Sequence, residues 1–284
     1  MAQQRIGRIQ WGSLVFGPGD RYHVTAVEGL DDLPDIRSQD IDRPDQHGDY
    51  TGPDYTAARI IQIGLGLRAD TPDELRDLTL ALRAATQPQS TPAPMRFLDQ
   101  DTLVYGKVRR RSIPYDAEYL WRTGTAALEL YCADPYLYGL EERSATTTAY
   151  SPAAGRTYPM VHPRSYGAPG QSGRITAYNR GDSPAYPVLR LDGPVANPTI
   201  EQVNTGAVIT VDAVLQEGEY LLIDTRTRAV LYMGTSPRRS WVRAGSRWPL
   251  LLPGSNELAY RGSALPGSPG QQSLLTVTWR DTSL

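Results

Sequence analysis

Short strand patterns separated by turn residues run through residues 173–284, and no helical pattern interrupts them. β-rich segments recur at Ile175–Tyr178, Tyr186–Leu191, Ala207–Val211, Tyr220–Asp224, Ala229–Met233, Leu258–Arg261 and Leu274–Trp279. Strands of this length and spacing must pair with one another to bury their apolar faces. The spacing therefore predicts an antiparallel β-sandwich over residues 173–284.

Residues 1–138 form a different block, which is mostly strand but contains one clear helix. Strands are expected at Tyr22–Val27, over residues 61–67, where apolar side chains alternate, at Leu103–Arg111 and at Thr125–Cys132. At Thr71 the pattern changes to a capping box, in which the Thr71 hydroxyl and the Glu74 carboxylate satisfy free amides. Pro72 suits the first helical position. The helix is expected to bury a face containing Leu75, Leu78 and Leu82.

Two further stretches have unusual composition. Residues 31–54 hold eight aspartates between the first of these strands and the next. A loop of this length inside a compact domain is usually functional or is ordered by a partner. Residues 139–172 are rich in small residues and in Pro and Gly, which cannot bury enough surface to form a core. They are expected to form a connector, or an arm laid across a neighbouring molecule.

The overall composition excludes several classes of protein. The 284 residues carry a net charge of only −2, so no global field attracts nucleic acid or an anionic membrane. No apolar stretch approaches ~20 residues, which predicts no membrane insertion. The polar start predicts no secretory signal, and Cys132, the sole cysteine, is expected to be a small buried hydrophobe. These features predict a soluble protein made in a reducing compartment, without sequence-specific nucleic-acid binding.

The chemistry-bearing residues form no recognisable site. His23, His47 and His162 lie far apart, without the ligand spacing that zinc or di-iron sites require, and no nucleophile elbow, phosphate loop or dinucleotide fingerprint occurs. We therefore expect no catalytic residues, no cofactor site and no metal site. Two alternatives stay open. The pairs Asp99 with Asp101 and Glu141 with Glu142 could supply a glycosidase, and Asp40, Asp42 and Asp45 could bind calcium, although they do not match an EF-hand loop.

Several motifs, taken in order, resemble those of siphophage distal tail (Dit) proteins. In the first block, Val27-Glu28-Gly29-Leu30 is followed by an acidic loop with Arg37 and Asp40, by the capped helix and by a strand with Tyr105. The block closes with the apolar run that leads to Ala133-Asp134-Pro135-Tyr136. The second block resembles the galectin-like sandwich of the same proteins. The matching segments are Asn179-Arg180-Gly181-Asp182 before Pro184, then Gly218–Thr225, and then Trp248–Gly254 with Asn256.

This resemblance implies a mainly β fold, with an α+β N-terminal domain over residues 1–138 and an antiparallel galectin-like β-sandwich over 173–284. It also implies a structural protein of the virion, made in the host cytoplasm, that is not an enzyme. Such a protein forms a homohexameric ring between the tail tube protein and the tail-tip or fibre proteins, and leaves a channel for DNA. The alternatives are a carbohydrate-binding adhesion module and a glycan-cleaving tail enzyme. Because residues 173–284 contain no histidine to orient a sugar, we expect Trp248 to pack the end of the sandwich and not to bind glycan.

Overall fold

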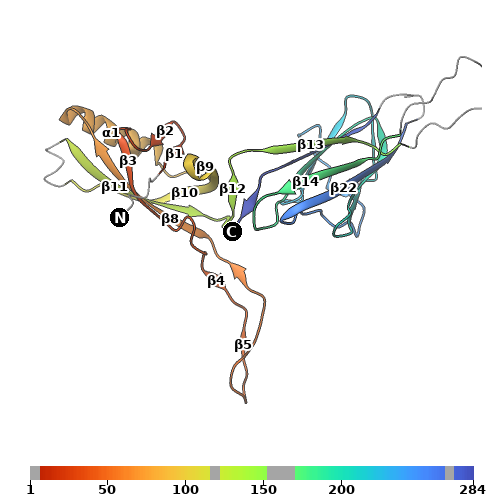
Figure 1. Ribbon diagram of the computed structural model, residues 1–284, viewed down its shortest axis with the longest axis horizontal. Helices are drawn as coiled ribbons and strands as arrows, with labels where there is room; N and C mark the ends of the chain where they lie inside the picture. The colour runs from red at the N-terminus through yellow and green to blue at the C-terminus, as the bar shows by residue number, and fades with distance from the viewer. Residues whose placement is uncertain (1–6, 116–121, 152–169, 266–271) are drawn as a thin grey trace, which may run out of the picture. The chain divides into compact units, whose positions relative to one another are not determined.

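The computed structural model describes residues 7–115, 122–151, 170–265 and 272–284 (Figure 1). The fold is mainly β, with antiparallel sheets and, among the described residues, a single α-helix, as the sequence predicts. The chain divides into two compact units, Met1–Leu140 together with Leu284, and Glu141–Ser283.

The N-terminal unit is built on a sheet with the strand order β2-β1-β9-β10-β11-β8-β3, in which every neighbouring pair is antiparallel. The bounds of these strands are β1 Ile9–Trp11, β2 Leu14–Phe16, β3 Tyr22–Glu28, β8 Arg59–Arg68, β9 Ala93–Phe97, β10 Thr102–Ser112 and β11 Thr123–Cys132. The long strand β10 joins two halves, since its first residues pair with β9 and its last residues with β11. β12 (Leu137–Gly139) also pairs with the start of β10, close to the short 3-10 helix Leu98–Gln100.

Helix α1 (Pro72–Ala85) covers one face of this sheet, and its start follows the predicted capping pattern (Figure 1). The Thr71 hydroxyl accepts a hydrogen bond of 3.2 Å from the Glu74 amide. The Glu74 carboxylate reaches back one residue further than expected and accepts the Asp70 amide at 2.7 Å. Leu75 and Leu82 are fully buried and Leu78 is partly buried, so the expected face packs on the core.

The core of the N-terminal unit comes from alternate residues of adjacent strands. Ile61, Ile63, Leu65 and Leu67 of β8 are each at most 1% exposed and pack beside Ala126, Leu128, Leu130 and Cys132 of β11. Burial raises the pKa of the Cys132 thiol to about 12. Cys132 is therefore part of the packing, as expected from its place in an apolar run.

The acidic stretch of the N-terminal unit is a long, narrow β-hairpin that projects away from the sheet (Figure 1). β4 (Ile36–Arg37) pairs with β7 (Tyr55–Thr56) and, further out, β5 (Ile41–Asp42) pairs with β6 (Asp49–Tyr50). Each pairing is only two residues long, which is why the sequence showed a loop without strand periodicity. We call residues 31–57 the acidic hairpin.

The C-terminal unit is an antiparallel β-sandwich, as predicted, with its core between two sheets. One sheet has the order β13-β23-β15-β19-β20-β21, with bounds Arg143–Thr148, Leu274–Trp279, Val188–Asp192, Tyr220–Asp224, Val230–Tyr232 and Ser236–Pro237. The other has the order β14-β22-β16-β17, with bounds Arg174–Asn179, Gly254–Ser263, Val195–Gln202 and Ala207–Thr210; β18 (Val214–Leu215) pairs with β16. A 3-10 helix (Arg239–Trp241) follows β21, and β24 (Thr282–Ser283) is the last strand.

Part of the stretch 139–172, which the sequence predicts to be a connector, is folded. Strand β13 pairs along its whole length with β23, and the Arg143 guanidinium forms an ion pair of 2.8 Å with Asp281. Ser151 and Gln171 then exchange backbone hydrogen bonds. Residues 152–169, which include His162, lie outside the described residues.

Candidate functional site

The acidic hairpin carries large apolar side chains that remain mostly exposed within its own unit. Leu33, Ile36, Ile41, Tyr50 and Tyr55 are each more than half exposed. A two-stranded hairpin of this kind is at best marginally stable in water when nothing packs against it. Its exposed apolar residues therefore make it a candidate surface for contact with another chain.

The root of the hairpin is fixed by Arg59, the first residue of β8, whose side chain is only 2% exposed. Its Nη1 donates to the carbonyls of Gly29 (3.1 Å), Leu30 (2.6 Å) and Asp32 (2.6 Å). Its Nε donates to the Pro135 carbonyl at 2.8 Å. Burial lowers the pKa of this guanidinium, but arginine stays charged in proteins. One buried cation thus ties both the hairpin and the segment after β11 to the sheet.

Two of the sequence motifs form the surroundings of Arg59. Gly29 has a φ of 82°, and a Cβ built on it would lie 2.1 Å from the Ile60 carbonyl oxygen, so the position requires glycine. In the Ala133–Tyr136 motif, the Asp134 carboxylate accepts the Tyr138 hydroxyl at 2.6 Å, which holds the turn that presents the Pro135 carbonyl to Arg59. The two motifs are far apart in sequence and meet at one buried side chain.

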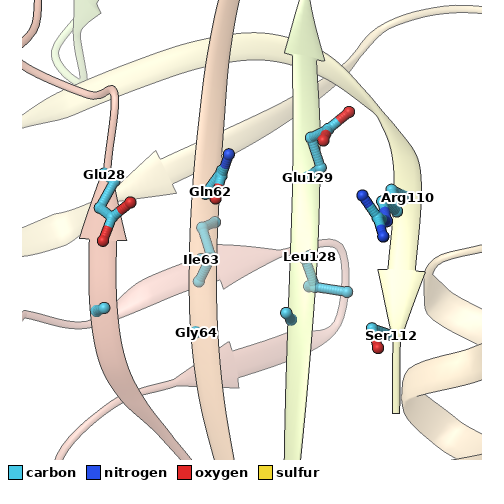
Figure 2. Close-up of a pocket in the computed structure, with 10 residues that line it drawn as sticks. Glu28, Gln62, Ile63, Gly64, Arg110, Ser112, Leu128 and Glu129 are labelled. Carbon is cyan, nitrogen blue, oxygen red and sulfur yellow. The ribbon is translucent and has the colours of Figure 1, made fainter. Parts of the chain in front are cut away.

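The sheet face opposite the core carries two rows of side chains in register (Figure 2). Glu28, Gln62, Glu129 and Arg110 lie opposite one another on β3, β8, β11 and β10. The next row contains only small residues, Ala26, Gly64, Ala127 and Ser112, and together the rows line a shallow pocket of about 330 Å³. The small row leaves this part of the sheet flat, a surface that another backbone can approach closely.

The run Arg109–Arg111 at the end of β10 is divided between two environments. The Arg109 guanidinium stacks over the Tyr131 ring, 3.3 Å from its centroid, and Arg110 lines the shallow pocket. Arg111 instead donates to the Arg83 carbonyl (2.9 Å) and the Thr86 hydroxyl (2.7 Å) at the C-terminal end of α1, where a cation is favoured. Arg109 and Arg111 therefore make specific contacts within the unit.

The residues considered for chemistry stay apart. His23 lies in β3 with its ring over Gly66, and His47 lies at the tip of the acidic hairpin. Asp99 lies in the short 3-10 helix and Asp101 directly follows it, and Glu141 forms an ion pair with Arg143 at 3.2 Å. Among the residues the structure describes, no group of three or more His, Cys, Asp or Glu is placed to hold a metal, so Asp40, Asp42 and Asp45 form no such group. No helix in the described part is long and apolar enough to span a membrane.

In the C-terminal unit, the matched motifs serve the packing of the sandwich. Trp248 is partly buried against the core, and the Arg239 guanidinium covers its ring at 4.2 Å from the centroid. Arg180-Gly181-Asp182 forms a turn in which the Gly181 amide donates to Asn179 Oδ1, and a Cβ on Gly181 would collide with the Thr282 carbonyl. Asn256 accepts the Leu252 amide at 2.9 Å and so fixes the loop after Trp248.

Sequence reasoning missed Arg59 altogether. An arginine at the first position of a strand is ordinarily exposed, and its four carbonyl partners are contributed by two segments distant from each other in sequence. The one available indication was the set of motifs on either side, Gly29-Leu30 and Asp134-Pro135, because these contain the acceptors.

Comparison with known proteins agrees with this architecture. Residues 180–280 match the family described as "Siphovirus-type tail component, C-terminal domain". The fold is similar to the crystal structure of the Dit protein of phage SPP1, described as a paradigm of the hub adsorption apparatus in phages that infect Gram-positive bacteria. The TM-score is 0.66 and the identity 16%, over 93% of this chain and 95% of that one.

A second similar fold is a chain of the phage p2 baseplate in its activated conformation with Sr. Its TM-score is 0.50 and its identity 12%, over 95% of this chain and 96% of that one. No curated protein sequence matches this chain. At such identities the solved structures establish a shared fold. Together with the family match, they confirm the resemblance to siphophage distal tail proteins.

Proposed function

Because the chain has a Dit-like fold and carries a siphovirus tail-component domain, we propose that it is a structural protein of the siphovirus tail tip that assembles into a ring. The match of residues 180–280 to the tail-component family carries this proposal. In the proposed role the ring joins the end of the tail tube to the tail-tip or fibre proteins. It acts by assembly, in the virion, without catalysis.

The acidic hairpin is the proposed contact between copies of the chain. Its exposed apolar side chains need cover, and its root is held by Arg59 so that it projects in a defined direction. In a ring of six copies every interface joins the same two patches, one on each of the two neighbouring copies, and the two patches differ from each other. A rigidly rooted hairpin that packs on the next copy supplies such a contact.

The experiment that tests this contact replaces the apolar pair at the outer end of the hairpin. Ile41 and Tyr50 lie opposite each other, so Ile41→Ser with Tyr50→Ser removes apolar surface without touching either folded core. Leu80→Ser is the matched control, since Leu80 is 48% exposed on α1. Light scattering over a concentration series should show that wild type and control associate and that the double variant shifts towards monomer. Wild-type-like association of the double variant would contradict the proposed contact.

We also propose that the acidic hairpin lines the channel or its rim. A ring that passes DNA must not bind phosphates strongly, because each cationic contact adds salt-dependent affinity. Residues 31–57 contain eight aspartates against two arginines. Hydrogen bonds from Ser38 and from the Gly52 amide lower the pKa of the Asp40 carboxyl. An assembled structure with these aspartates on the outer surface and Arg109, Arg110 and Arg111 around the hole would refute the assignment.

A further inference from the structure

The C-terminal unit contains a pocket of about 570 Å³ at one end of the sandwich that none of the motifs above explains. Four arginines line it, Arg226, Arg228, Arg239 and Arg247, together with the rings of Tyr186 and Trp248. No carboxylate is among the residues that line it. We call it the basic pocket.

One wall of the basic pocket is a rigid turn between β19 and β20. The Asp224 carboxylate accepts the amides of Arg226 (2.8 Å) and Thr227 (3.2 Å) and the Thr227 hydroxyl (2.7 Å). Arg228 then takes a positive φ of 58°, and the buried Thr225 hydroxyl donates to the Pro187 carbonyl at 2.8 Å. Because the turn is held at so many points, its two arginines are presented from a fixed backbone.

A second part of the lining comes from the 3-10 helix and the loop after it. The Arg239 guanidinium lies over the Trp248 ring, and the Arg247 amide donates to the Val208 carbonyl at 2.8 Å. An ion pair between Arg243 and Asp212 holds the start of the same loop. Cation–π stacking restricts Arg239 before any ligand arrives, which lowers the entropic cost of binding.

Three of the arginines that line the pocket, Arg228, Arg239 and Arg247, bring positive charge without a carboxylate partner among the described residues. Several arginines elsewhere in the C-terminal unit do have carboxylate partners, as in the pairs Arg174 with Glu257 and Arg190 with Asp192. Arg228, Arg239 and Arg247 take part in none of the ion pairs found among the described residues. Like charges collected in one concave site repel one another, and an anionic ligand relieves this repulsion.

The pocket does not fit a neutral sugar. A sugar ring needs a free aromatic face, and Arg239 covers the face of Trp248 that it stacks upon. Guanidinium groups are instead suited to carboxylate and phosphate oxygens, which they bind in bidentate fashion. The volume of about 570 Å³ also leaves room for more than one anionic group.

We propose that the basic pocket binds the carboxylates of an acidic peptide segment of a neighbouring tail protein. The choice of a protein partner rests on the proposed function, in which tail proteins are the neighbours of this chain. Anchoring of such a segment at the end of the sandwich makes the C-terminal unit an attachment domain.

The test uses the full chain and a hexaglutamate peptide blocked at both ends, titrated by calorimetry at physiological salt. The expected result is saturable binding of one peptide per chain, weakened at least tenfold by Arg228→Gln with Arg239→Gln. Arg261→Gln is the matched control, since it removes an exposed charge from the same unit outside the pocket, and should leave binding within twofold of wild type. Binding should also weaken as salt is raised.

Three results would overturn the proposal: no saturable binding, equal loss in the Arg261 control, or binding of a polyphosphate probe in preference to the peptide. The third would make the pocket a phosphate site. Light scattering on the same variants separates this proposal from the ring. Loss of peptide binding with intact assembly is the expected behaviour of the double variant, whereas a wild-type chain that binds peptide but never assembles refutes only the ring.

Discussion

Arg59→Met removes the buried cation at the root of the acidic hairpin and keeps an unbranched apolar side chain of nearly the same length. The four carbonyls that Arg59 bonds then lose their donor. Only the Leu30 interaction is fully buried, and the other three lie where water can reach part of the group. The variant therefore probes how strongly one side chain fixes the hairpin.

The expected cost follows from these bonds. At about 1 kcal/mol for each hydrogen bond lost, the four contacts together contribute roughly 4 kcal/mol. Water replaces some of the lost bonds, and the variant no longer buries a charge, which offsets part of the loss. We therefore expect the free energy of unfolding of the N-terminal unit to fall by about 2–4 kcal/mol.

Urea unfolding of the full chain measures this loss, and hydrogen exchange locates it. Amides of residues 29–34 should exchange faster in Arg59→Met, while those of β22 and β23 in the C-terminal unit stay unchanged. Arg68→Met is the control, because Arg68 lies exposed on the same strand, and should stay within about 0.5 kcal/mol of wild type. Wild-type stability and exchange in Arg59→Met would refute the assignment of Arg59 as the anchor of the hairpin.

Gly29→Ala should destabilise the N-terminal unit by about 2 kcal/mol or more, because the backbone is strained there and the new Cβ clashes with the Ile60 carbonyl. Gly12→Ala is the control, since Gly12 also has a positive φ but lies in open space. In urea unfolding it should cost less than Gly29→Ala. Limited trypsin digestion should cut first within the predicted connector, residues 139–172, and, because β13 pairs with β23, the two pieces should stay associated until the chain is denatured. Initial cleavage within 173–284 would contradict the connector assignment. The Cys132 thiol, with its pKa raised to about 12, should resist a thiol reagent at pH 8 until the chain unfolds. Because the ordinary pKa of the thiol is 9.0, its contribution to stability is present below that pH and is lost as pH rises towards 12. Trp248→Ala should lower the free energy of unfolding by about 2 kcal/mol. On a glycan array the wild-type chain should give no specific signal. A specific signal that Trp248→Ala abolishes would contradict the packing role of Trp248.

The strands and the helix that the sequence predicts share a strong local pattern. Alternation over residues 61–67 and the capping box at Thr71 mark β8 and α1 because burial of one face and satisfaction of the first-turn amides are decided locally. β19 and β23 occur at the predicted residues for the same reason.

Strands with an irregular backbone escaped prediction. β16 contains Pro198, and Asn197 within it has a φ of 48°, beside a shift of register against β22. β9 begins at Ala93-Pro94 and directly follows a Pro-rich stretch. Both are real strands because tertiary pairing compensates for residues that disfavour the extended ladder.

The surfaces were harder to predict than the fold, because they depend on segments that meet only in three dimensions. The arginines of the basic pocket come from two separate loops, and neither loop has a pattern that points to the other. The acidic hairpin could be recognised by its composition, but its exposed apolar residues became informative only once the structure showed them uncovered.

The most direct test of ring assembly is negative-stain imaging of the purified full-length chain. Ring assembly predicts round particles with six-fold symmetry and a central hole, of about 188 kDa for six copies of 31.3 kDa. Particles of single-chain size at every concentration, with or without the tube protein, would contradict it.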